Sequence, residues 1–429
     1  MSITKKRKMY MTGGIPIYPG GFSCVFKPQL KCKSKNKMKR NKTRRNKYSG
    51  NYDKMGISKL LFKQHAKLEM DNIQLFYNAL KSIPKSHKYF LFTKSKLCSP
   101  AKISKRDLNG FDNMCTSFTS REINESNINA NIDSLRLINM PNAGVTVNEW
   151  LLNTRLTSAR IILFNKLMTE LIVNAIVPMN KMGVIHNDVK EDNILISLSK
   201  TNPRPTIIDW GISGISTPHN PIPEIIMNRY ISVSNPFSSI IFTSDFIMSY
   251  SEFLQTHNNP LSPSFRQELA SFALSQYLKF KDLGHYSYVE RFFIAAYTFQ
   301  KKVMDSNPNF NEEAYEAQII EDTYHKYASA YISDVLFHFT EFDNSGIGRF
   351  HYAKYFTQVY IFNCDIWGTM CCYNVFFSII KEPATIQHIN PVMYLNFLTR
   401  LLSIFTTEIM VNGDKKVNVK KLVTSLKGN

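Results

Sequence analysis

Residues 186–196 have the sequence HNDVKEDNILI, in which a dense group of polar side chains runs directly into an apolar strand. The polar part fits the pattern H-x-D-x-K-x-x-N, with Asp188, Lys190 and Asn193 at its last three fixed positions. A carboxylate, a cation and an amide oxygen on one short loop can orient a nucleophile, offset negative charge and bind a hard metal ion. The alternative is an ordinary polar turn between a helix and a strand.

A second polar element follows at residues 207–211, with the sequence IIDWG. On its own, an Asp-Trp-Gly tripeptide is typical of many surface turns. At this spacing from the first motif, phosphoryl transfer explains both. Asp188 would orient the attacking hydroxyl and accept its proton, and Lys190 would lie near the transferred phosphate. Asn193 and Asp209 would then bind the metal ion that bridges the phosphates.

Together the two motifs resemble those of the eukaryotic protein kinase superfamily. The long-inserted form is similar to the divergent kinases of large cytoplasmic DNA viruses, over about residues 18–230 and 355–405. The resemblance implies a serine/threonine kinase with protein substrates and with ATP bound in a cleft between two lobes. It also implies dependence on Mg²⁺, with Mn²⁺ as an alternative ion, and a location inside the cell, in the host cytoplasm or the virion.

The resemblance assigns structural roles to three further residues. Asp365, in the sequence NCDIWG at residues 363–368, matches an aspartate that holds the backbone of the catalytic loop in such kinases. An acidic residue near a helix N-terminus is the alternative interpretation. His186 is expected to be structural, and Gly211 is expected to let the chain turn away from Asp209.

The ATP-binding residues are expected in the first third of the chain. Residues 18–26, YPGGFSCVF, resemble the loop that covers the phosphates, although a plain hairpin turn is the alternative. Lys59 lies mid-strand between apolar residues and would pair with the α- and β-phosphates, with Glu69 or Asp71 as its partner. The expected ATP-binding set is Gly20, Gly21, Phe22, Val25, Lys59, Glu69, and the backbone of Ile138 and Met140 for adenine.

The order of the predicted elements indicates an α+β fold, with a small antiparallel-sheet lobe before a larger, mainly helical lobe. The expected parts are a basic arm at 1–17, an N-lobe at 18–138 with a basic loop at 31–50, and a C-lobe at 139–429 with a helical insertion at about 240–350. The N-lobe is predicted to hold a strand-turn-strand at 18–30, a strand at 55–61, a helix at 62–80, strands at 89–97 and 135–140, and a loop at 98–131.

The positive charge is concentrated at the start of the chain. The formal net charge is +20, and residues 1–50 hold 15 Lys or Arg and no Asp or Glu. This segment predicts a contact with polyanions, such as nucleic acid or an acidic substrate. The run at 31–47 carries no aromatic residues, so any nucleic-acid contact would be with phosphates alone.

The cysteines and the most apolar stretch indicate whether the chain lies inside the cell or in a membrane. Seven cysteines without a CxxC pair favour reduced thiols over a disulfide framework. The most apolar stretch, 161–185, is interrupted by polar residues, so no transmembrane segment is expected. Two alternatives to an active kinase are a pseudokinase scaffold with a decayed glycine loop and a basic nucleic-acid-associated protein with a kinase-like body.

Overall fold

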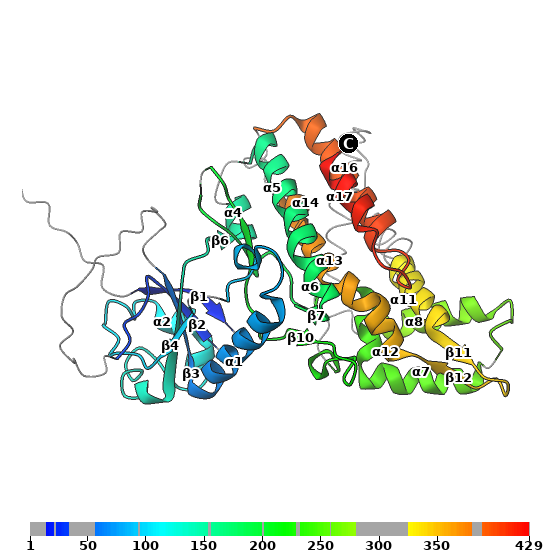
Figure 1. Ribbon diagram of the computed structural model, residues 1–429, viewed down its shortest axis with the longest axis horizontal. Helices are drawn as coiled ribbons and strands as arrows, with labels where there is room; N and C mark the ends of the chain where they lie inside the picture. The colour runs from blue at the N-terminus through cyan, green and yellow to red at the C-terminus, as the bar shows by residue number, and fades with distance from the viewer. Residues whose placement is uncertain are drawn as a thin grey trace, which may run out of the picture. The chain divides into compact units, whose positions relative to one another are not determined.

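The computed structural model describes residues 14–20, 23–33, 56–92, 95–152, 156–199, 201–228, 232–257, 259–279, 325–379 and 388–428. These residues form a mixed α and β structure with a small antiparallel sheet and extensive helix (Figure 1). The chain divides into two compact units. The first contains residues up to Asn78 together with Phe92–Ala143, and the second contains Ala79–Leu91 together with the chain from Gly144 onward.

A five-stranded antiparallel sheet forms the centre of the first unit, in the order β1-β2-β3-β5-β4. Successive residues of a strand point to opposite faces, and β3 shows this alternation. Its Ser58 and Leu60 lie on one face, and Lys59 and Leu61 lie on the other. The strands are β1 (Ile15–Gly20), β2 (Ser23–Lys27), β3 (Ile57–Phe62), β4 (Lys96–Cys98) and β5 (Leu135–Met140).

Both faces of this sheet are covered. Helix α1 (Lys63–Leu80) follows β3 directly, and its Ala66 packs with Leu61 and Ile138 on one face. On the other face, the segment 103–128 contributes a larger apolar cluster around Phe111 and Phe118. That segment includes the short helices α2 (Phe111–Met114) and α3 (Thr116–Thr119), together with turns. The expected plain loop at 98–131 is therefore a packed layer.

Four of the seven cysteines form disulfide bonds within the first unit, Cys24–Cys115 and Cys32–Cys98. The prediction of reduced thiols is wrong for these four. The paired residues are 91 and 66 positions apart, so no local spacing signals the bonds. The remaining three cysteines form no disulfide bond and are buried: Cys364, Cys371 and Cys372.

Two other local predictions are also corrected in this unit. The expected arm at 1–17 ends sooner, because β1 already begins at Ile15. Among the described residues of the strand expected at 89–97, which exclude 93 and 94, Phe90 makes an isolated bridge and regular strand is confined to β4, Lys96–Cys98. Most of the basic loop, residues 34–50, lies outside the described residues.

The described part of the second unit is mainly helical, with three small sheets. Its strands are β6 (Val145–Thr146), β7 (Val184–Ile185), β8 (Ile194–Ile196), β9 (Pro205–Ile207), β10 (Gly214–Ile215), β11 (Thr340–Phe342) and β12 (Gly348–Phe350). Its α-helices are α4 (Val147–Leu152), α5 (Ser158–Leu171), α6 (Val177–Lys181), α7 (Ser244–Thr256), α8 (Phe265–Leu278), α11 (His325–Phe339), α12 (Tyr352–Tyr355), α13 (Ile361–Cys371), α14 (Asn374–Ile379), α16 (Pro391–Ile404) and α17 (Val419–Lys427).

One continuous helix, formed by α5, a π-turn at Ile172–Ile176 and α6, runs through the core of this unit. The Thr157 side chain caps its first turn by accepting from the amide of Arg160. Among the described residues, it is the one helix long and apolar enough to cross a membrane. Its most apolar window is 56% buried inside the protein, which is how a core helix behaves.

The described part of the predicted insertion is helical, with one hairpin. Helices α7, α8 and α11 account for most of it, and β11 pairs with β12. Helices α8 and α11 pack against each other. Residues 280–324 lie outside the described residues.

Reduction is expected to destabilise the first unit. Removing a native disulfide typically costs about 2–5 kcal/mol, because the unfolded chain regains conformational freedom. Wild-type protein should therefore unfold at a lower urea concentration when a thiol reductant is present. A variant with Cys24, Cys32, Cys98 and Cys115 all changed to alanine should unfold at one urea concentration with or without reductant.

The matched control is the double variant Cys371→Ala/Cys372→Ala, which removes two free thiols and leaves both bonds in place. It should retain the sensitivity to reductant. Wild-type unfolding that does not respond to reductant would contradict the two disulfide bonds.

Candidate active site

The side chain of Asp365, in α13, holds the backbone of the 186–193 loop. Its Oδ2 accepts hydrogen bonds from the His186 amide at 2.9 Å and from Asn180 Nδ2 at 2.8 Å. Its Oδ1 accepts from the Asn187 amide at 2.8 Å. Asp365 is only 1% exposed. Three donors on one buried carboxylate fix the direction in which the loop leaves β7.

His186 is a neutral structural residue of the same network. Burial lowers the pKa of its imidazole, so the uncharged ring is favoured at neutral pH. Its Nε2 lies 3.0 Å from the carbonyl of Ile208, and the Asp188 amide lies 3.4 Å from Nδ1. This pattern assigns the proton to Nε2. The ring also stands edge-on to Trp210, with 4.8 Å between ring centroids, and so links the two motifs.

The Asp188 carboxylate is fixed by two neighbours on its own loop. Lys190 Nζ lies 3.0 Å from Oδ2 and 3.2 Å from Oδ1. Asn193 Nδ2 donates to Oδ2 at 2.8 Å and to the Asp188 carbonyl at 2.9 Å. The hydroxyl of Ser234 lies 3.5 Å from Oδ1. The structure therefore brings together the three residues that the first motif predicts.

Asn193 and Asp209 lie at the same end of a hairpin. Strand β8 begins directly after Asn193, and β9 ends two residues before Asp209. The antiparallel register pairs Ile194 with Ile207, and the Ile208 amide donates to the Asn193 carbonyl at 3.0 Å. The second motif is thereby joined to the first through the backbone as well as through the His186–Trp210 contact.

The turn after β9 is made by Asp209 and not by the glycine that follows it. Asp209 has φ of 65°, in the left-handed region, whereas Gly211 is outside that region. A Cβ built on Gly211 would meet only Oδ1 of Asp209, at an ordinary 3.6 Å. The expected need for glycine at this turn is therefore not supported by the backbone. The left-handed conformation is uncommon for Asp, although Asp adopts it more readily than most residues.

The donor set of this edge fits a hard divalent cation. Both hydrogen bonds made by the Asn193 side chain use Nδ2, which directs Oδ1 away from Asp188. An amide oxygen and the exposed carboxylate of Asp209 are the ligand types that Mg²⁺ prefers. Within the described residues, no group of three or more His, Cys, Asp or Glu could hold a metal ion by itself.

Helix α13 also positions a second segment, at residues 233–237. The indole Nε1 of Trp367 donates to the Val233 carbonyl at 3.1 Å. Asn235 Nδ2 donates to Oδ1 and the carbonyl of Asn187, at 3.0 and 3.2 Å. Phe237 stands edge-on to Trp367, at 5.0 Å. The Asn-Pro-Phe sequence at 235–237 thus anchors its segment to α13 and to the 186–193 loop.

Gly368 has a packing role that the sequence did not indicate. A Cβ at this position would lie 2.2 Å from the Val189 carbonyl oxygen and 3.1 Å from that of Ser234. Only a glycine permits both segments to approach α13 so closely. Asn180, which donates to Asp365, was also missed, because its partner lies 185 residues away in the sequence.

In the first unit, Lys59 and Glu69 form the expected ion pair. Lys59 Nζ lies 2.9 Å from Glu69 Oε2, and the two side chains are 17% and 20% exposed. Because β3 runs straight into α1, the lysine and the glutamate face each other across the strand–helix junction. Asp71, the alternative partner, does not form the pair.

The other predicted ATP-binding residues lie beside Lys59 on the sheet, in the backbone of β5, or at the turn after β1. Val25 and Ile138 are the direct cross-strand neighbours of Lys59, so all three share one face of the sheet. Ile138 has paired strands on both sides, and the Met140 carbonyl accepts from Gln29 Nε2 at 3.0 Å. The sheet therefore already uses much of the backbone that was expected to hold adenine. Gly20 ends β1, whereas Gly21 and Phe22 lie outside the described residues.

No protein-family model matches the chain, and a search of curated proteins gives no match. The functional argument therefore rests on the geometry of the described residues.

The substitution Gly368→Ala is expected to destabilise the second unit by about 1–3 kcal/mol, because the new methyl group overlaps the Val189 carbonyl. In an unconstrained helix, the same change would be stabilising by about 1 kcal/mol, so the sign of the effect is informative. Urea unfolding followed by circular dichroism measures the difference. Gly211→Ala is the matched control and should stay within about 0.5 kcal/mol of wild type.

Proposed function

We propose that this chain is a serine/threonine protein kinase that transfers the γ-phosphoryl group of ATP to a protein hydroxyl. One observation carries the proposal: Asp188 is fixed by Lys190 and Asn193, and Asn193 is joined through the backbone to the turn that presents Asp209. Positioning and electrostatic stabilisation supply most of the catalysis of phosphoryl transfer, and this loop is built for positioning.

Each residue of the loop has a role in the proposed reaction. Asp188 orients the acceptor hydroxyl and accepts its proton as the new oxygen–phosphorus bond forms. The bond between the γ-phosphorus and the bridging oxygen breaks, and ADP leaves with that electron pair. The Lys190 ammonium, 3.0 Å from Asp188 Oδ2, offsets negative charge on the transferred phosphoryl group.

Asn193 and Asp209 are the residues that would hold a divalent cation. When bound, Mg²⁺ or Mn²⁺ neutralises phosphate charge that develops as the leaving group departs. What the chain itself contributes is rigidity. The Asn193 amide is held by Asp188, and Asp209 makes the turn after β9 with a left-handed backbone.

The first unit supports the finer proposal of a kinase-like, two-lobed fold. A lysine on a central strand pairs with a glutamate on the following helix at 2.9 Å, which leaves a fixed cation available for the α- and β-phosphates. The second unit provides the complementary feature, a catalytic loop attached to a central buried helix through Asp365.

A phosphorylation assay with labelled ATP separates an active kinase from the two alternative functions. A pseudokinase scaffold would bind nucleotide without turnover. The proposal of turnover is supported by Asp188, Lys190, Asn193 and Asp209, which are all present at the site. A nucleic-acid-associated protein would use the basic residues 1–50, of which 1–13 and 34–50 lie outside the described residues.

The substitutions Asp188→Asn and Asp209→Asn are each expected to lower the phosphorylation rate by about 10²–10⁴-fold, because one removes the proton acceptor and the other a metal ligand. Incubation with labelled ATP, Mg²⁺ and a generic protein substrate measures the rate, and circular dichroism checks that the variants fold. Asp192→Asn is the control, since it removes a carboxylate from the same loop outside the Asp188 hydrogen bonds. Folded Asp188 and Asp209 variants with wild-type rates would refute the assignment.

The acceptor is expected to be serine or threonine. A short hydroxyl side chain must come close to Asp188, where the Lys190 ammonium can contact both the carboxylate and the γ-phosphate. A tyrosine ring would hold its oxygen farther out. Phosphoamino-acid analysis of the product should show phosphoserine and phosphothreonine. Predominant phosphotyrosine would contradict the acceptor class while leaving the kinase activity itself intact.

A further inference from the structure

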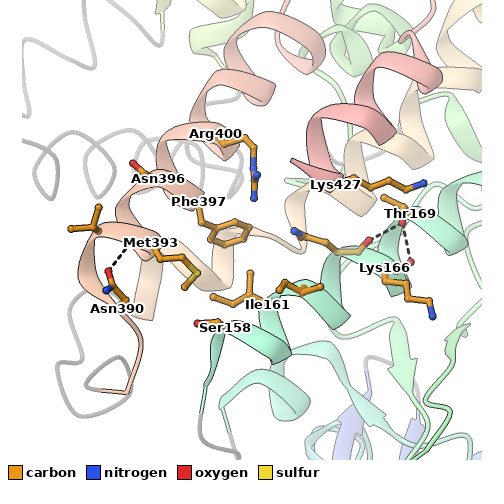
Figure 2. A pocket seen from close by; sticks show the side chains of 13 residues that line it. Ser158, Ile161, Lys166, Thr169, Asn390, Met393, Asn396, Phe397, Arg400 and Lys427 are labelled. Carbon is orange, nitrogen blue, oxygen red and sulfur yellow. Dashed lines mark hydrogen bonds between the residues drawn. The ribbon is translucent and has the colours of Figure 1, made fainter. Parts of the chain in front are cut away.

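A cavity of about 770 Å³ lies between α5 and α16, with Lys427 of α17 at its edge (Figure 2). Its lining residues all belong to the second unit, and none of the residues of the Asp188 loop is among them. Its volume falls within the range of about 300–1,000 Å³ that is typical of small-molecule sites.

The walls of this cavity are apolar on both helices. Ile161 and Phe397 lie in the middle of the view in Figure 2, from α5 and α16 respectively, with Met393 near them. Two further lining residues, Ile162 and Val392, are 68% and 65% exposed. Large aliphatic side chains exposed on two facing walls favour a ligand with an apolar chain, because burying them against it removes apolar surface from water.

Three cations lie among the lining residues, and no lining residue is acidic. Figure 2 shows Lys166 and Lys427 at one end, Arg400 above Phe397, and Asn390 and Met393 at the other end. Among the described residues, Glu170 lies 4.0 Å from Lys166, and no ion pair joins Arg400 or Lys427 to an acidic residue. A ligand seated on the apolar walls would therefore present an anionic head group to this end.

A buried amide lies beside the same end of the cavity. Asn165 lines the cavity and is 7% exposed, and its Nδ2 donates to the Leu426 carbonyl at 3.1 Å. Its Oδ1 has no hydrogen-bond donor within the described part of the chain. Buried acceptors are normally paired.

We propose that this cavity binds a long-chain carboxylate, a free fatty acid, with its chain on Ile161 and Phe397 and its head group at the Lys166–Lys427 end. The apolar walls disfavour a purely polar polyanion, and the three cations disfavour a neutral or cationic amphiphile. The cavity volume is that of a small-molecule site and does not require a protein partner. This ligand site is independent of the proposed kinase activity.

Isothermal titration calorimetry of the full chain tests the proposal, with decanoate and laurate below their micellar concentrations. Each additional buried methylene should tighten binding about fourfold. Laurate should bind at least about tenfold more tightly than dodecanol, since charged hydrogen bonds to the head group are lost in the alcohol. Equal binding of laurate and dodecanol, or no binding of either, would overturn the proposal.

Two variants locate the site. Ile162→Asp puts a negative charge on an exposed wall position, and Lys427→Gln removes a cation, so each should weaken laurate binding by about tenfold. Val173→Asp is the matched control, because Val173 is exposed on the same continuous helix and does not line the cavity. Its affinity for laurate should match that of wild type. Equal weakening by Ile162→Asp and Val173→Asp would show that laurate binding is non-specific and not located in this cavity.

A vesicle assay distinguishes a free fatty acid from a membrane surface as the source of the anionic amphiphile. Sedimentation with phosphatidylserine vesicles, without calorimetric binding of monomeric laurate, would refute the proposal. Laurate binding to the protein in the absence of any vesicle supports it.

Discussion

The carboxylate of Asp365 lies where water cannot stabilise its charge, and burial raises its pKa above the usual value for aspartate. Such a group is tolerable only with enough donors, because a buried charge left unpaired is strongly destabilising. Asn180 and the amides of His186 and Asn187 supply those donors. The same hydrogen bonds therefore stabilise the Asp365 carboxylate and fix the backbone of the 186–193 loop.

Several other features depend on this attachment. Once His186 is fixed, its ring bonds the Ile208 carbonyl and contacts Trp210, so the turn at Asp209 takes its position from the same anchor. The absence of a side chain at Gly368 lets the loop lie directly on α13. The Asn235 amide then links the following segment to Asn187. Asp365, His186 and Gly368 thus fix the positions of the 186–193 loop and of the turn at Asp209.

The parts of the site that sequence predicted are those set by nearby residues. Asp188, Lys190 and Asn193 meet because they share a short loop, and Lys59 meets Glu69 because a strand runs directly into a helix. Gly368 and Asn180 act through residues remote in sequence, and no periodic pattern marks such contacts. The two disulfide bonds were not predicted for the same reason, because the paired cysteines are remote in sequence. The sequence motif assigned the turn after β9 to Gly211, whereas the left-handed backbone of Asp209 makes that turn.

Predictions of the fold were likewise correct where the determining contacts are local and wrong where they are remote. The strand expected at 55–61 and the helix expected at 62–80 are present as Ile57–Phe62 and Lys63–Leu80, because each burial pattern is local. The strand expected at 89–97 failed because Phe90 pairs with Ile207, far along the chain, and not with its neighbours. Apolar residues near one another in sequence do not show which remote strand they will join.

The assignment of Ala79–Leu91 to the second unit has a practical consequence for anyone cutting the gene into fragments. No single uninterrupted stretch of coding sequence encodes the first unit alone, since any fragment that spans β1 to β5 also carries this segment. In such a fragment, Phe90 would lose the Trp210 ring 5.5 Å away and its bridge to Ile207. Exposing one such side chain to water costs about 1.5–3 kcal/mol, so the fragment would be prone to aggregate. Replacing the segment with a short polar linker is the better design.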